Sequence, residues 1–264
     1  MFYPKGLLAV LGSLVALYAF IVPVSGVQVS TRNQDVISQA RDAYYSLATR
    51  GVRSFKASIE PKWEVILGHS ATPENLKVFR ALRFSMTFDA NGKVRLSHEV
   101  TAKINPRLES SVVQIHDNMQ RLVEGFFATW AMFVVGSPFP ETGVSSRVET
   151  SGVEYRIFNT LQSGDVMFTM TMSDFVITDW RFTGPRGKRV VKPLFHKAAD
   201  GLLLSGYQST FESPSGIKTT LEFHIEYRDV SGFKLPHKIL MSGMYASEPV
   251  EAELIFNRYV LNPH

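Results

Sequence analysis

From about residue 140 to the end of the chain, apolar and polar residues alternate in short runs separated by turn residues. A period of two places successive side chains on opposite faces of a strand. The runs that we interpret as strands are 147–150, 153–158, 166–172, 175–182, 189–195, 202–211, 217–228, 233–241 and 251–260. Because the turns between them are short, the pattern predicts an antiparallel meander, since parallel strands need long crossover connections.

The first half of the chain contains one clear hairpin. Leu82, Phe84, Met86 and Phe88 alternate with polar residues, a turn at 89–92 contains Asn-Gly, and a second alternating run starts at Val94. This pattern predicts two paired strands with one apolar and one solvated face. A short strand is expected at 54–59, and a short helix or turn is expected from residue 73.

Two segments follow a helical period instead. Residues 33–50 carry an apolar face before Gly51, and residues 109–135 repeat apolar side chains every three or four positions. The apolar end of the second segment, residues 125–138, is too short to cross a bilayer, so we expect a covering helix or lid.

The predicted fold class is therefore α+β and β-rich: a curved antiparallel sheet, forming an unclosed half-barrel of about eleven strands, covered by two helices. The early helices must cover the sheet because each has an apolar stripe and the sheet has an apolar face. No internal repeat or linker interrupts residues 27–264, which favours a single domain.

The N-terminus is typical of a secretory signal peptide. Lys5 precedes an uncharged apolar run, and small residues follow it, so we expect cleavage between Gly26 and Val27 and a periplasmic or secreted mature form. An uncleaved N-terminal membrane anchor is the alternative. The chain has no cysteine, which excludes a lipoprotein signal with a lipid-bearing cysteine, disulfides and thiolate chemistry. Its formal charge of +4 is too mild to indicate a nucleic-acid partner.

Aromatic and methionine side chains from the hairpin, the long helix and a later strand could line an apolar cavity between sheet and helix. The predicted ligand-binding wall consists of Phe84, Met86, Phe88, Phe126, Trp130, Phe133, Phe168, Met170 and Met172. The alternative is that these residues form an ordinary core.

No known catalytic or metal-binding motif is present in the sequence, so we expect neither an enzyme nor a bound metal or cofactor. The segment 184–189 reads as a basic hairpin turn, with a lesser alternative as a surface patch for anionic head groups. Glu222, His224 and Glu226 share one strand face, which we interpret as solvated.

The order of elements, together with residues 40–47, 52–59, 225–227 and 232–239, resembles the outer-membrane lipoprotein-sorting family (LolA/LolB-like). The resemblance implies an unclosed barrel with a helical lid and an apolar cavity for acyl chains. The chain departs from the family in its middle section, 61–141, and lacks a recognisable lid-latching arginine, which points to a divergent relative.

The leading hypothesis is an exported carrier or sensor that binds lipid acyl chains or an acylated protein in an apolar cavity. The alternative is a non-catalytic envelope module with the same fold and a filled core, which binds another protein through sheet edges or exposed aromatics. A hydrolase with a non-standard site is a third reading, and it requires a cleft with perturbed carboxylates or histidines.

Overall fold

The computed structural model describes residues 31–101, 109–139, 146–245 and 248–263. The predicted signal peptide, 1–26, lies outside these residues. Within them the chain forms one sheet of twelve strands in the order β3-β2-β1-β12-β11-β10-β9-β8-β7-β6-β5-β4. Every strand pair for which a register is given is antiparallel, and β3 and β4 end the order, so the predicted β-rich, unclosed antiparallel sheet is confirmed.

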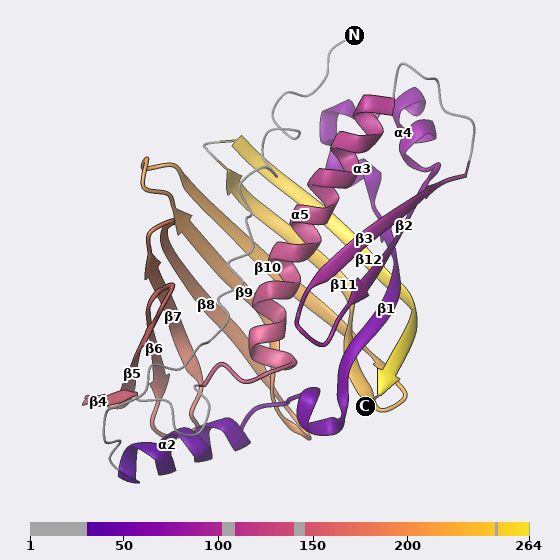
Figure 1. Cartoon of the computed structure of the whole chain (residues 1–264). Coiled ribbons are helices and arrows are strands. Elements are labelled where there is room, and N and C mark those ends of the chain that lie inside the picture. The colour runs from indigo at the N-terminus through magenta and orange to yellow at the C-terminus, as the bar shows by residue number, and fades with distance from the viewer. Residues whose placement is uncertain (1–30, 102–108, 140–145, 246–247, 264) are drawn as a thin grey trace. The chain divides into compact units, whose positions relative to one another are not determined.

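Most strands are longer than the alternating runs suggested, and there are twelve where the predicted fold class had about eleven. Their bounds are β1 (Val52–Pro61), β2 (Leu82–Phe88), β3 (Val94–Val100), β4 (Arg147–Ser151), β5 (Glu154–Leu161), β6 (Gly164–Thr171), β7 (Ile177–Gly184), β8 (Gly187–Ala198), β9 (Gly201–Glu212), β10 (Lys218–Val230), β11 (Phe233–Tyr245) and β12 (Glu248–Pro263). The helices are α2 (Thr31–Asp42), α3 (Trp63–Leu67), α4 (Pro73–Phe79) and α5 (Glu109–Val134), as labelled in Figure 1.

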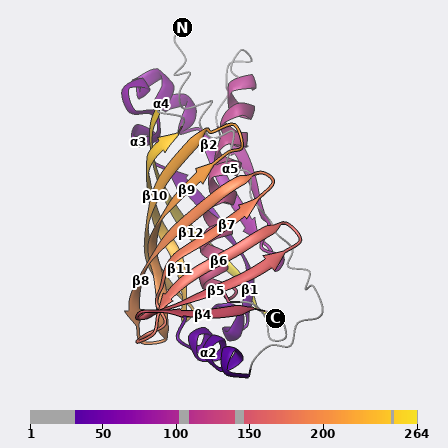
Figure 2. The ribbon, with the colours of Figure 1, turned by 90° about the vertical axis from the view of Figure 1, so that its left-hand side faces the viewer.

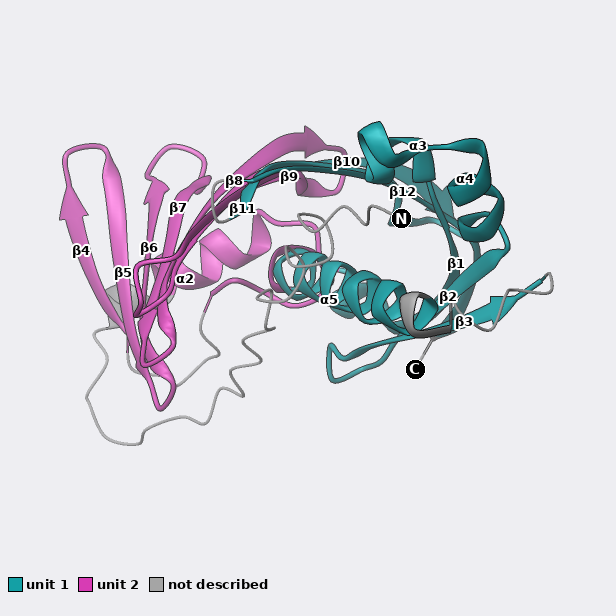
Figure 3. Cartoon of the chain, turned by 90° about the horizontal axis from the view of Figure 1, so that it is seen from above, with its two compact units in different colours: residues 1–17, 47–131, 224–264 teal, residues 18–46, 132–223 magenta. Residues whose placement is uncertain are grey.

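Residue contacts divide the chain into two compact units (Figure 3). Of the described residues, 47–101, 109–131, 224–245 and 248–263 belong to unit 1, and 31–46, 132–139 and 146–223 belong to unit 2. In unit 1 the strands from β10 to β3 curve around α5, which lies on one face of this part of the sheet. The expected long helix at 109–135 is thus confirmed as α5, and in this unit it covers the sheet as expected.

Unit 2 contains the successive hairpins from β4 to β9, whose strands lie side by side in Figure 2. The β7–β8 hairpin is tight, because Gly184 pairs directly with Gly187 and only Pro185 and Arg186 form the turn; β4–β5, β5–β6 and β8–β9 have two-residue turns as well. The register is continuous through each pair, apart from single irregularities in β6–β7 and β8–β9. Residues that pair across these strands lie on the same face of the sheet, so the register shows which side chains share each face.

The prediction of a helix over 33–50 is wrong in its second half. Helix α2 ends at Asp42, and the chain then runs beside β9: Leu202 donates a backbone hydrogen bond to Ala43 (2.8 Å), and Tyr45 donates one to Leu202 (3.1 Å). Gly201, with φ +120°, permits this approach, because a Cβ there would lie 2.9 Å from backbone atoms of the 43–45 segment. Tertiary pairing therefore overrides the helical period of the sequence.

Candidate functional site

The predicted ligand wall divides between the two units. Phe84, Met86 and Phe88 on β2 and Phe126 and Trp130 on α5 belong to unit 1. All five are at most 3% exposed. They lie on the face that α5 covers, because Phe88 pairs with Phe55, whose ring contacts Trp130 at 6.1 Å.

In unit 1 these side chains pack on other rings of the protein. Phe127, which is completely buried, is the centre of the cluster. Its ring centroid lies 5.0–5.9 Å from those of Phe126, Trp130, Phe256, Phe88 and Phe55. The Trp130 indole also donates a 3.0 Å hydrogen bond to Tyr227 Oη. Such offset and edge-to-face contacts are those of a packed core, so unit 1 resembles the alternative of a filled core more than a ligand wall.

The other predicted wall residues lie in unit 2. Phe133, Phe168 and Met170 are completely buried, and Met172, just beyond the end of β6, is partly exposed. Phe133 packs edge-on against Phe195 at 5.7 Å, and Phe168 packs edge-on against Phe139 at 5.4 Å. Phe133 and Phe139 thus cover one end of the sheet face that carries Phe168 and Phe195.

Two cross-strand rows follow Phe168 along the same face of the unit 2 sheet. The first row is Ile157–Phe168–Trp180–Val191–Ser209, and the second, two residues further along each strand, is Asn159–Val166–Phe182–Arg189–Phe211. Most members of both rows are buried. Trp180, Arg189 and Phe211 are the exceptions, because water still touches a part of each. Trp180 and Phe182 stack with ring centroids 6.4 Å apart.

Arg189 is the functional candidate that sequence reasoning missed. Lys188 and Arg186 of the same basic hairpin are exposed, whereas Arg189 points to the apolar face between Phe182 and Phe211. Its Nε donates a 3.3 Å hydrogen bond to Ser209 Oγ. The side chain lies deep among protein atoms, and this burial lowers the pKa of the guanidinium. It remains charged, because arginine does not lose its proton in proteins.

The second row contains a further polar group, Asn159. Its Oδ1 is buried, and no described residue donates a hydrogen bond to it. A buried carbonyl oxygen without a donor costs free energy. The second row thus combines apolar side chains with a cation and a polar acceptor, while the first row is apolar up to Ser209.

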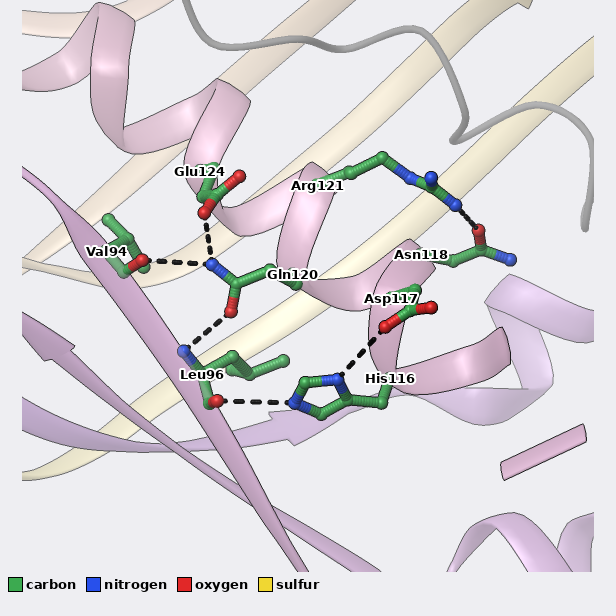
Figure 4. A network of polar contacts seen from close by, with 8 residues as sticks. All are labelled: Val94, Leu96, His116, Asp117, Asn118, Gln120, Arg121 and Glu124. Atoms are coloured by element: carbon green, nitrogen blue, oxygen red, sulfur yellow. Dashed lines mark hydrogen bonds and ion pairs between the residues drawn. The ribbon is translucent and has the colours of Figure 1, made fainter. Parts of the chain in front are cut away.

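The sheet edges bear on the protein-binding alternative. On β3, the last strand at one end of the order, the Gln120 side chain accepts a hydrogen bond from Leu96 N (2.7 Å) and donates one to Val94 O (2.9 Å), and His116 Nε2 lies 3.2 Å from Leu96 O (Figure 4). Helix α5 thereby occupies backbone groups that an added strand would need.

The strand at the other end of the order, β4, is short and charged. It has five residues, and Arg147 forms an ion pair with Glu149 (3.2 Å) and lies 4.4 Å from the Phe158 ring centroid. Among the described residues, no two of the large exposed apolar side chains share a helix or strand, and two of them lie in turns: Val65, Val100, Val113, Val153, Leu194, Ile217, Met244 and Val260. Short, charged edges and scattered apolar residues do not favour strand addition or a broad apolar interface.

Acid–base and metal chemistry has little support in the described residues. His224 and Glu226 are exposed on β10 and Glu222 is partly exposed, in line with the solvated face expected for them. No three histidine, aspartate or glutamate side chains described here gather into a group that could hold a metal ion. Neither unit contains, in its described part, a helix long and apolar enough to cross a bilayer.

Comparison with known proteins adds no relative. No protein-family model, curated protein or solved structure matches this chain. The resemblance to the LolA/LolB-like family therefore stays a prediction.

Proposed function

We propose that the protein is a non-catalytic carrier or sensor of the cell envelope, which binds the acyl chain of a lipid or acylated protein on the apolar face of the unit 2 sheet. One observation carries this proposal: Trp180 and Phe211 keep contact with water within rows whose other apolar members are buried. Covering apolar surface gains about 25 cal/mol per Å², so an acyl chain laid along these rows would be stabilised.

The proposal places the ligand away from the aromatic cluster around Phe127. In that cluster the rings of Phe88 and Trp130 already pack against Phe127 of the same chain. The export signal expected at 1–26 would deliver the protein to a compartment where it meets lipids or acylated proteins. The capped and charged sheet edges make the protein-binding alternative the weaker one.

Quenching of tryptophan fluorescence by a bromine-labelled fatty acid tests the site directly. The chain has three tryptophans, of which Trp63 and Trp130 are at most 4% exposed, whereas Trp180 is partly exposed. The full chain is expressed in a bacterial host, purified from the periplasm without detergent and titrated. Saturable quenching is expected for the wild type and for Trp130→Phe, and it should disappear in Trp180→Phe.

Mass spectrometry of the same preparation under native conditions supplies an independent readout, since a co-purified lipid adds its mass to the chain. Quenching that persists in Trp180→Phe but is lost in Trp130→Phe would move the ligand to unit 1. If no acyl probe binds and no lipid co-purifies, the carrier function is wrong and the protein-binding module becomes the first choice.

A further inference from the structure

We infer that Asn159 accepts a hydrogen bond from a neutral N–H or O–H group at the polar end of the amphiphile whose chain lies along the apolar face of unit 2. This inference rests on the proposed function and names the class of its ligand. It starts from the position of Asn159 in the second row, where it pairs with Val166 across β5 and β6. The residue is only 8% exposed, and no described residue donates a hydrogen bond to its Oδ1.

The neighbours of Asn159 on this face explain why its oxygen has no donor. Side chains two residues apart on a strand share a face, so Ile157 and Leu161 flank Asn159 along β5. Across the strands lie Val166 and, opposite Leu161, Gly164. None of these four residues has a side chain that can donate a hydrogen bond.

Asn159 also lies at the margin of the paired strands, where a ligand can reach it. The edge strand β4 begins at Arg147, which pairs with Phe158, so no residue of β4 lies opposite Asn159. Leu161, on the same face, is partly exposed. Because the last torsion of an asparagine side chain is soft, Oδ1 can turn toward the part of the residue that water touches.

The type of residue at this position also points to a ligand. Asparagine is unfavourable in strands, which prefer β-branched and aromatic residues. A buried carbonyl oxygen without a donor lowers stability further, and a valine or leucine at this position would avoid both costs. A hydrogen bond from a ligand offsets the second cost. The donor is neutral, because apolar surroundings disfavour a charged group.

The two rows give the ligand a direction. From Asn159 the second row continues only toward β6, because β4 does not reach this position. Trp180 of the first row is two strands away, on β7, and two strand spacings are roughly 10 Å. A polar end at Asn159 therefore places the first part of the chain over Val166 and Phe168 and a later part over Trp180.

The test compares the N-methyl amide and the methyl ester of one bromine-labelled fatty acid on the full chain. The two probes differ in a single N–H, which the ester replaces by an oxygen that cannot donate. Quenching of tryptophan fluorescence measures both affinities. Because the probes also differ in hydration, the quantity to compare between variants is the ratio of the amide affinity to the ester affinity. A fatty alcohol of the same chain length, measured against the same ester, presents an O–H instead.

Asn159→Leu keeps the branched shape of the side chain and removes its polar atoms. The affinity ratio should fall at least about fivefold in this variant, because only the amide offers a donor to Oδ1. Asn159→Ala removes the same atoms without adding volume and should give the same fall. Gln208→Leu removes an exposed amide from the opposite face of β9 and should leave the ratio unchanged.

The possible results separate the role of Asn159 from the carrier function. If the probes bind wild type but both variants of Asn159 keep the wild-type ratios for the amide and for the alcohol, the carrier stands and the hydrogen bond from the ligand is overturned. Should no probe bind wild type, the proposed function itself fails. A fall for the amide supports an N–H donor, as in an acylated amine, and a fall for the alcohol alone supports a hydroxyl donor.

Discussion

Tyr44 joins three segments of unit 2 through one side chain. Its hydroxyl donates a 2.8 Å hydrogen bond to Phe175 O and accepts one of 2.8 Å from Ile177 N, and its ring packs edge-on against Phe139 and Phe195. Phe175 adopts φ +58°, a conformation that is unfavourable for a bulky residue. The hydroxyl thus supports a strained turn, and the burial that this requires raises the pKa of Tyr44.

Replacement of Tyr44 by phenylalanine tests this support. The ring contacts would remain, but the Ile177 amide and the Phe175 carbonyl would lose their partner. We expect the free energy of unfolding to fall by about 1–3 kcal/mol, the cost of leaving buried backbone groups unsatisfied. Urea unfolding measures it, with Tyr155→Phe on β5 as the matched control. Equal stability of the Tyr44 variant and wild type would show that the hydroxyl does not hold the turn.

The contact between the rings of His98 and His116 predicts that stability depends on pH. Their ring centroids are 4.9 Å apart, and burial together with the repulsion from His116 lowers the pKa of His98 below its usual value of 6.5. A lowered pKa means that the folded state binds the proton less readily than the unfolded state. The contribution of His98 to the free energy of unfolding is therefore complete above its usual pKa of 6.5. It declines as the pH falls toward the lower pKa that His98 has in the folded state.

The urea midpoint should accordingly drop between about pH 7 and pH 5. His98→Gln should flatten this decline, whereas His69→Gln, at an exposed position, should leave it unchanged. A decline of equal size in His98→Gln and wild type would assign the pH dependence to other groups. Histidine spacing in the sequence could not have indicated this pair, because the two residues lie on different elements.

At the scale of elements, register explains what the sequence could and could not predict. Alternation identified the β2–β3 hairpin and the meander, and the three-to-four spacing identified α5. Alternation did not show which basic residue of the β7–β8 hairpin faces the apolar side of the sheet. Lys188 is exposed, and its neighbour Arg189 faces the apolar rows. A shift of one residue exchanges the two faces of a strand, so a cluster of basic residues alone cannot tell which one points inward.

Gln120 provides a test of how α5 covers the edge of β3. Its amide replaces the hydrogen bonds of a neighbouring strand to Val94 and Leu96. We expect Gln120→Ala to lower the free energy of unfolding by about 1–2 kcal/mol and to increase self-association, because the edge becomes available to a second chain. Urea unfolding and light scattering measure the two effects. Gln114→Ala, at an exposed position of the same helix, is the control, and equal behaviour of the two variants would contradict the capping role.

For the whole molecule, the most informative result is the division of the predicted ligand wall. Hydrophobic periodicity selected Phe126, Trp130 and Phe133 as one stripe of a helix, yet contacts assign Phe133 to unit 2 and the other two to unit 1. Hydrophobic periodicity and composition identify positions that are buried, but they do not show which other residues bury them. That is why the fold class was predictable and the distinction between a packed core and a binding face was not.

Hydrogen exchange upon ligand addition tests that distinction across the whole chain. If an amphiphile binds on the unit 2 rows, backbone amides of β6 to β9 should exchange more slowly when a fatty acid is present, because binding stabilises the state that it contacts. Amides of β1, β2 and β3 should change little, since the cluster around Phe127 already buries their apolar face. Protection confined to β1, β2, β3 and α5 would instead restore Phe84, Met86 and Phe88 as the ligand wall and contradict binding on the unit 2 rows.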